Sequence, residues 1–369
     1  MIRASALLLV LLGLLLPAHA APPAQRVAAL QRGMNITNWL RFPARADPAA
    51  IGAYLSDAAI ADLRHVGFTF VRLPFAPSFA ATEAGRVLLI AQVRRLQRVG
   101  LAVVLVPSGN PWRLEQRPED RAALVDTWRR LAPALRALDP DRTFPEVVNE
   151  PVFSGKASSW SMLQGEVLAA LRAALPASTV ILSGADWSSI DGLATMAPVA
   201  DPNVIYTFHF YDPSELTSLA AYRPGLDRAA LARLPFPVDD PAACAREAAS
   251  PEPATQGLVA FVCAQHWDES AIAARIGRAA AWAARNRAVL VAGELGASAR
   301  LNAPARLAWI KAVRGECERA GIGWALWGYD DVMGFDVPRP PPRRPTLDSD
   351  LLAALGLPRI KTPGHGPGE

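Results

Sequence analysis

The sequence predicts an α/β fold, a single-domain (β/α)8 barrel, and three observations lead to this prediction. Eight short apolar runs that fit buried strands alternate with Ala- and Leu-rich helical patterns along nearly the whole chain. Two of these runs each lead to a glutamate, which puts charge where the strands of a barrel meet its loops. No Gly/Ser linker or internal repeat divides the 369 residues, and such barrels often reach this length as one domain.

The strand-like runs are short and apolar, as expected for strands that are buried on both faces. In chain order they are 33–38, 69–73, 101–106, 144–149, 180–183, 204–209, 289–293 and 323–327. The helical patterns lie at roughly 57–66, 86–99, 119–137, 158–174, 188–195, 268–286, 304–320 and 348–355. Gly100 and Gly321 each follow such a pattern, where glycine is a typical helix stop.

Residues 1–20 have the composition of a secretory signal, and we expect the barrel domain over 21–361. Arg3 supplies the positive charge, Leu7 to Leu16 form the apolar stretch, and small residues at 18–20 precede a cleavage point. An apolar stretch of about 10 residues is too short for the ~20 that a membrane span needs. We therefore expect a secreted or periplasmic protein without membrane association after cleavage; a retained membrane anchor is the alternative.

The net charge of +4 and the pI of about 9.2 raise the question of nucleic-acid binding. The arginines are spread along the chain, and only three lysines are present: Lys156, Lys311 and Lys361. Solvated helix faces explain this distribution better than a phosphate-binding stripe does, so we expect no nucleic-acid partner. The spacings of Cys and His match no zinc site, so we expect no metal ion and no cofactor.

The stretch 212–266 is an unusually long connection, since loops beyond ~15 residues are usually functional or disordered. Cys244 and Cys263 can form a disulfide across it, whereas Cys317 lies on a predicted helix and is expected to be a free, partly buried thiol. The aromatic side chains in and beside this stretch are Tyr211, Tyr222, Phe236, Phe261 and Trp267. We expect it to form one wall of a substrate cleft; a surface excursion unrelated to substrate is the alternative. We expect residues 362–369 to form a disordered tail.

Two glutamates suggest the chemistry. Glu150 follows the apolar Val147 and Val148 and precedes Pro151, and Glu294 ends another apolar run. In a barrel both would point to the face at the carboxyl ends of the strands, where barrel enzymes place their chemistry. Two such carboxylates are the minimal equipment for cleaving a glycosidic bond: one protonates the leaving oxygen, and the other attacks or activates water. For either residue alone, a solvated Glu in a strand-to-helix turn is the alternative.

Four further side chains are expected at the same ends of successive strands. Arg72 follows the second strand, His209 and Tyr211 the sixth, and Trp327 the eighth. An arginine beside a carboxylate would keep it ionised, as a nucleophile requires. The alternatives are an ion pair that tethers a helix for Arg72, a core imidazole for His209, and packing at the rim for Tyr211 and Trp327.

These residues resemble the family 5 glycoside hydrolases, the cellulase-type endoglucanases and their relatives, over about 31–356. The motifs that carry the resemblance are Arg-Gly-Met-Asn-Ile at 32–36, Val-Arg-Leu-Pro at 71–74, Val-Val-Asn-Glu-Pro at 147–151, Ala-Asp-Trp-Ser-Ser-Ile at 185–190, His-Phe-Tyr at 209–211, Gly-Glu at 293–294 and Trp-Ala-Leu-Trp at 324–327. The resemblance implies that Glu150 is the acid/base and Glu294 the nucleophile. It also implies that His209 and Tyr211 orient the carboxylates and that Arg72 supports Glu294.

The resemblance implies substrate contacts as well. Asn149 would bind the 2-hydroxyl of the sugar, Trp327 would be the platform under the ring, and Trp39 is a further expected contact. The third strand departs from the family, because an Asp-x-His pattern is replaced by Val-Pro-Ser-Gly-Asn ending at Asn110. Ser108 or Asn110 is expected to take the place of the missing imidazole.

The sequence thus predicts an exported, retaining, endo-acting β-glycosidase, a monomer that hydrolyses β-glucan by double displacement. A β-mannanase and an exo-acting glucosidase are alternatives within the same chemistry, and an inactive carbohydrate-binding barrel is the alternative from another class. For the acid/base to start protonated and the nucleophile ionised, the pKa of Glu150 should be raised and that of Glu294 lowered.

Overall fold

The structure is a computed structural model and describes residues 21–43, 47–108 and 112–359. The predicted signal at 1–20 and the predicted tail at 362–369 therefore lie outside the described residues. Within the described residues, no helix combines the length and the apolar composition that crossing a bilayer requires.

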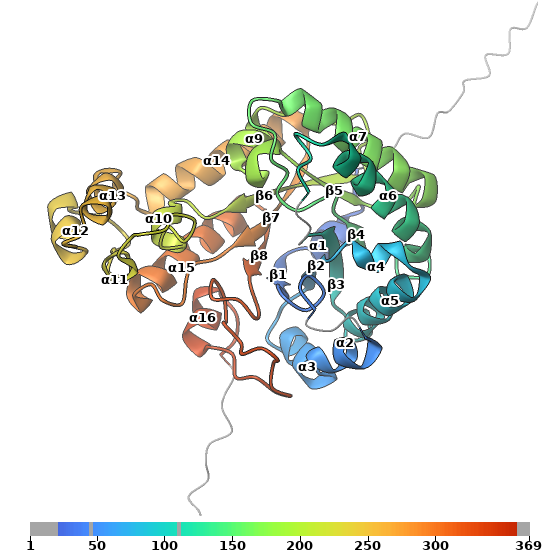
Figure 1. Cartoon of the computed structure of the whole chain (residues 1–369), viewed down its shortest axis with the longest axis horizontal. Helices are drawn as coiled ribbons and strands as arrows, with labels where there is room; N and C mark the ends of the chain where they lie inside the picture. The colour runs from blue at the N-terminus through green and yellow to red at the C-terminus, as the bar shows by residue number, and fades with distance from the viewer. Residues whose placement is uncertain (1–20, 44–46, 109–111, 360–369) are drawn as a thin grey trace, which may run out of the picture.

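Eight parallel strands form a nearly closed barrel, which confirms the predicted fold class (Figure 1). The strands are β1 (Arg32–Asn35), β2 (Phe70–Phe75), β3 (Ala102–Pro107), β4 (Thr143–Pro145), β5 (Val180–Ser183), β6 (Val204–Phe210), β7 (Val289–Leu295) and β8 (Gly323–Trp327). Their order is β4-β3-β2-β1-β8-β7-β6-β5, and a single bridge from Glu146 to Ile181 joins the two outer strands. The first and fourth strands end earlier than the sequence predicts.

Helices surround the barrel, and each helical pattern predicted from the sequence corresponds to one of them. They are α1 (Ala24–Ala29), α2 (Pro48–Tyr54), α3 (Asp57–His65), α4 (Ser78–Ala81), α5 (Glu83–Arg98), α6 (Pro118–Leu135), α7 (Ala157–Ala174), α8 (Ala185–Ser188), α9 (Ile190–Ala194), α10 (Ser214–Thr217), α11 (Arg228–Leu231), α12 (Pro241–Glu247), α13 (Pro253–Ala264), α14 (Glu269–Asn286), α15 (Ala303–Arg319) and α16 (Ser349–Ala354). Ser56, Thr82 and Asp268 cap α3, α5 and α14 with side-chain oxygens. Gly100 and Gly321 follow α5 and α15 with positive φ, as the sequence predicts.

The interior of the barrel is apolar at one end and polar at the other. One core cluster contains Leu30 and inward-facing strand residues, among them Phe70, Phe144 and Ile205. Because side chains alternate along a strand, the next inward-facing residues are those two positions later. On β2 that residue is Arg72, and the polar layer that it begins lies toward the carboxyl ends of the strands.

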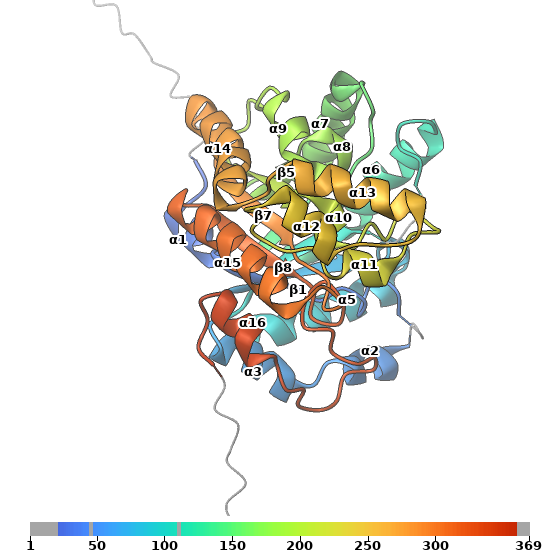
Figure 2. The same cartoon turned by 90° about the vertical axis from the view of Figure 1, so that its left-hand side faces the viewer.

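The stretch 212–266 is folded into four helices rather than a long loop. In both views α10 to α13 form a group of their own on the side of α14 and α15 (Figures 1 and 2). A disulfide joins Cys244 to Cys263, as predicted, and Cys317 is a buried free thiol. We call residues 212–266 the insertion. The amide of Ser298, in the loop after β7, donates to the carbonyl of Thr217 in the insertion at 2.7 Å, which holds the two segments together.

Candidate active site

Glu294 reaches the barrel interior because β7 contains a bulge. Phe208 of β6 pairs with Ala292 of β7, but the next residue, His209, pairs with Glu294, so Gly293 is one extra residue. With regular alternation Glu294 would face outward together with Ala292, which packs in the outer core. The bulge turns the carboxylate inward, where it is only 3% exposed.

Glu150 comes from a loop and not, as predicted, from the end of a strand. β4 ends at Pro145, and residues between it and Glu150 are held by other bonds: the indole of Trp128 donates to the carbonyl of Val147 at 2.7 Å, and the amide of Asn149 donates to that of Pro107 at 3.2 Å. Glu150 itself has a φ of 46°, in the left-handed region that non-glycine residues rarely adopt. Such a conformation costs about 1–3 kcal/mol and is found where surrounding contacts enforce it.

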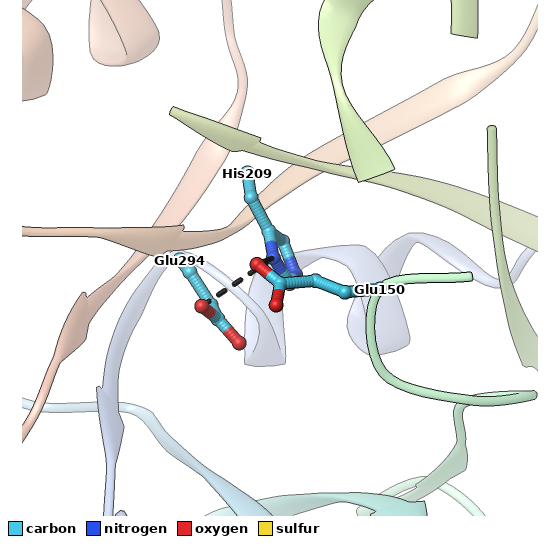
Figure 3. Close-up of side chains that lie close together, drawn as sticks. All are labelled: Glu150, His209 and Glu294. Atoms are coloured by element: carbon cyan, nitrogen blue, oxygen red, sulfur yellow. Dashed lines mark hydrogen bonds and ion pairs between the residues drawn. The ribbon is translucent and has the colours of Figure 1, made fainter. Parts of the chain in front are cut away.

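His209 lies between the two carboxylates (Figure 3). Its Nδ1 is 2.9 Å from Oε1 of Glu150 and 3.4 Å from Oε2 of Glu294. Its Nε2 is buried and has no partner among the described residues. One oxygen of each Glu and a ring nitrogen lie within 4.8 Å of one another, so these side chains are also a set that could hold a metal ion.

Arg72 is fully buried and binds four side chains. Its Nε and Nη2 each donate to Glu146 at 2.8 Å in a bidentate pair, and its Nη1 donates to Glu294 at 2.5 Å and to Asn35 at 3.1 Å. Nη2 also donates to the Oδ1 of Asn149 at 2.9 Å. The predicted contact between Arg72 and Glu294 is therefore present. Glu146 was missed, although it follows the inward-facing Phe144 by two positions and so belongs to the polar layer.

The predicted partners of the carboxylates lie at the same site. The hydroxyl of Tyr211 donates to Oε2 of Glu294 at 2.8 Å, and the amide of Asn149 contacts Oε2 of Glu150 at 3.4 Å. Trp327 is 8% exposed and lines the same cavity as both glutamates. The structure thus brings these side chains together at one site.

Burial raises the pKa of Glu294 above its usual value. The positive charge of His209 and that of Arg72 lower it, but less than burial and the charge of Glu150 raise it. The expected lowering of the pKa of Glu294 is thus wrong. Arg72 lowers the pKa of Glu294 only in part, because its charge is shared. Its Nε and Nη2 bind Glu146, and only Nη1 binds Glu294.

The pKa of Glu150 is lowered, which is also opposite to expectation. Burial raises it, but the hydrogen bond and charge of His209, followed by the charges of Arg72 and Arg41, lower it more. Since the two carboxyl groups are coupled, their titration belongs to the pair.

Two cavities share Glu150. The first, of about 520 Å³, contains both Glu150 and Glu294 and is walled in part by the insertion through Ser214, Ser218 and Leu219. The second, of about 350 Å³, is also lined by Glu150, together with Ser108, Trp112 and Trp187, among others. The expected cleft wall at 212–266 is thus present, although Phe236 is buried and Tyr222 and Phe261 face solvent.

One expected substrate contact, Trp39, does not line this cleft. Trp39 is completely buried, stacks on Tyr54 and donates through its indole to the carbonyl of Ile51 at 2.9 Å, so it belongs to the core. The prediction that Trp39 contacts substrate is wrong, because its ring is buried against Tyr54 and its N–H is already bound to Ile51. Asn110 lies outside the described residues, and Ser108 lines the second cavity.

The sequence matches the family model described as Cellulase (glycosyl hydrolase family 5) over residues 30–331, which is most of the chain. The chain belongs to glycosyl hydrolase family 5. The resemblance predicted from the motifs is therefore confirmed.

Individual relatives are distant. Endoglucanase 3 of Fibrobacter succinogenes is 26% identical over 330 residues, which are 81% of this chain and 49% of that protein, so the chain spans about half the length of that relative. Structures of Thermotoga maritima Cel5A in complex with cellobiose and with mannotriose superpose with TM-scores of 0.73 and 0.72 at 22% and 23% identity. Each match covers 90% of this chain and 99% of the other, and at that identity it establishes the fold.

Proposed function

We propose that this family 5 member hydrolyses β-linked glucan with retention of configuration. The observation that carries the proposal is the spacing of the catalytic pair: carboxylate oxygens of Glu150 and Glu294 lie within 4.8 Å of each other, with His209 between them. Retaining enzymes hold the two carboxyl groups about 5–5.5 Å apart, whereas inverting enzymes need ~6.5–9.5 Å to fit a water molecule.

The reaction then has two steps. Glu294 attacks the anomeric carbon while Glu150 gives its proton to the departing glycosidic oxygen, which forms a covalent glycosyl-enzyme. Glu150, now ionised, next takes a proton from water, and that water releases the sugar from Glu294. Arg72 and Tyr211 hold the attacking carboxylate by bonds of 2.5 and 2.8 Å, so it meets the substrate in a fixed orientation.

Endo action is supported by the shape of the cleft. The two cavities share Arg41, Asn149 and Glu150, so a sugar chain has room on both sides of the acid/base. An exo-acting enzyme would close one side. The name of the relative Endoglucanase 3 agrees with cleavage within a glucan chain, and the mannotriose complex of a structural neighbour makes mannan the second substrate to test.

The test is hydrolysis of soluble β-1,4-glucan and β-mannan, followed by measurement of new reducing ends and by NMR of the first anomer released. We expect a β anomer and a rapid fall in glucan viscosity. An α anomer would contradict retention, and binding without new reducing ends would identify a carbohydrate-binding barrel. We also propose export on the strength of residues 1–20, which N-terminal sequencing of the mature protein tests by a start at Ala21.

A further inference from the structure

Three arginines from three separate segments line the first cavity beside the catalytic pair. Arg41 comes from the loop after β1, Arg228 from the first position of α11 in the insertion, and Arg300 from the loop after β7. None of the interactions deduced for hydrolysis of a neutral glucan uses them. A neutral sugar chain presents hydroxyl groups, whereas guanidinium groups are suited to planar oxyanions.

None of these arginines forms an ion pair with an acidic side chain within the described ranges. Arg228 donates through Nη2 to the carbonyl of Arg223, while its Nη1 is buried without a partner. The Nε of Arg41 is likewise buried and has no hydrogen-bond partner in the described part of the chain. A buried donor left unsatisfied costs about 1–3 kcal/mol, so two such donors beside one cavity indicate a place that awaits an acceptor.

Arg41 is held in place before any ligand arrives. Its guanidinium carbon lies 5.3 Å from the ring centre of Trp327 and 4.8 Å from that of Phe42. Its loop is anchored, because the amides of Thr37 and Asn38 donate to Asp330 at 2.8 and 3.2 Å. The charge of Arg41 is thus fixed over the expected sugar platform, so a substituent of a bound sugar would meet it without further ordering.

The acidic groups of the cavity form no ion pair with the three arginines in the described ranges. Glu294 is paired with Arg72 at 2.5 Å, and Glu150 accepts from His209. The remaining carboxylate, Asp331, accepts from the amide of Met333 at 3.0 Å. The guanidinium groups of Arg41, Arg228 and Arg300 are therefore not held by an acidic partner, so they can bind an anionic group of a ligand.

We propose that this cavity binds an anionic substituent of the sugar chain, a carboxylate or a phosphate ester, and that the enzyme prefers acidic β-glucan to neutral β-glucan. The inference rests on the proposed function, because it assumes that a β-glucan occupies the cleft. Guanidinium groups bind carboxylate and phosphate by paired, charge-assisted hydrogen bonds. The insertion contributes by carrying Arg228 to the cavity.

The test compares three soluble cellulose derivatives with matched substitution: carboxymethyl, phosphate and neutral hydroxyethyl. We expect kcat/KM to be higher on an anionic polymer than on the neutral one, and the preference to shrink with added salt because charges are screened over about 10 Å at 0.1 M. The better of the two anionic polymers identifies the oxyanion. Equal kcat/KM on the three polymers at low salt would overturn the proposal.

Variants assign the preference to the cavity. Arg228→Gln and Arg300→Gln should each lower the ratio of anionic to neutral kcat/KM, by on the order of threefold to tenfold for a charge-assisted contact. Arg228→Lys should keep part of the ratio, since it keeps the charge. Arg246→Gln is the matched control, because Arg246 is an exposed arginine of the same insertion that does not line the cavity, and it should leave the ratio unchanged.

Binding separates this proposal from the proposed function. Affinity electrophoresis of the Glu294→Gln variant in gels that contain each polymer measures retention without turnover. If the anionic gels retain it more strongly and Arg228→Gln abolishes the difference, the anionic site stands even should no polymer be hydrolysed. If the polymers are hydrolysed but neither the binding in the gel nor kcat/KM depends on their charge, the β-glucanase proposal stands and the proposal of an anionic site is wrong.

Discussion

Glu146 and Glu294 share one buried cation: the bidentate face of the Arg72 guanidinium binds Glu146 at 2.8 Å, and its remaining nitrogen binds Glu294 at 2.5 Å. Three charged side chains are thus packed together where each is almost inaccessible to water. Such a cluster is stable only while its partners remain complete, because a lone buried charge is costly. Because Arg72 binds both carboxylates, the orientation of Glu294, the proposed nucleophile, depends on the same buried cluster as the stability of the fold.

The first prediction follows for stability. Arg72→Met leaves two buried carboxylates without their cation and should lower the free energy of unfolding by roughly 3–5 kcal/mol, the cost of breaking a buried pair. Denaturant unfolding measures the loss. Arg129→Met, which removes an exposed arginine of α6 that has no ion pair in the described structure, should change stability by less than about 0.5 kcal/mol. Equal stabilities of the two variants would show that Arg72 is not needed for the buried cluster.

The second prediction concerns the catalytic pair. Glu150→Gln and Glu294→Gln each keep the shape of the side chain but remove proton transfer or nucleophilic attack, so kcat should fall by about 10³-fold or more while the fold survives. Glu119→Gln on the surface of α6 should keep full activity. Circular dichroism checks the fold in each variant. Retention of most activity by either catalytic variant would mean that its role is wrongly assigned.

The strands and helices of the barrel were predicted well because each has a pattern in its own stretch of sequence. Apolar runs and helical periodicity depend on neighbouring residues, and all eight strands were found in the right places. The ends of β1 and β4 were missed, since pairing with another strand decides where a strand stops. The four helices of the insertion were missed as well, because α10 and α11 are single turns without a clear period.

The sequence predicted which residues form the site better than it predicted their pKa values. Motifs identified both glutamates, but the bulge at Gly293 and the left-handed backbone of Glu150 arise from tertiary packing and leave no pattern in the sequence. The pKa directions were wrong for a similar reason. The shared partner Glu146 and the close contact of His209 with Glu150 are consequences of the barrel's closure.

The third prediction tests the bulge. A Cβ on Gly293 would lie 2.5 Å from Oγ1 of Thr207, so Gly293→Ala should displace β7 and move Glu294 away from Tyr211. A displacement of about 1 Å can cost 10²-fold in rate, so kcat should fall by at least that factor. The double variant Gly293→Ala, Thr207→Ala relieves the contact and should recover part of kcat. If the double variant instead loses the sum of the two single-variant losses, the contact between the new Cβ and Thr207 is not the cause of the lower kcat.

The fourth prediction uses Tyr211, which can be changed with less damage than Arg72. Its hydroxyl donates to Glu294 at 2.8 Å and so favours the ionised carboxylate. Tyr211→Phe removes that bond, which raises the pKa of Glu294, and the acid limb of kcat/KM should move to higher pH. The alkaline limb, where Glu150 loses its proton, should move less. An unmoved acid limb would mean that the hydroxyl does not stabilise the nucleophile.

The last prediction has the opposite sign and depends on the shared cation. Glu146→Gln keeps the bulk of the side chain and an oxygen for Arg72 but removes a buried negative charge, so Arg72 then neutralises Glu294 alone. The pKa of Glu294 should fall, because its ionised form gains the undivided attraction of the guanidinium. Glu294 then takes up its proton only at lower pH, and the acid limb of kcat/KM should move to lower pH, in contrast to Tyr211→Phe. Full pH profiles of kcat/KM for the two variants, recorded on the same substrate, show whether the acid limbs move in opposite directions. A shift of both acid limbs in the same direction would show that Glu146 acts on the site through packing and not through its share of Arg72.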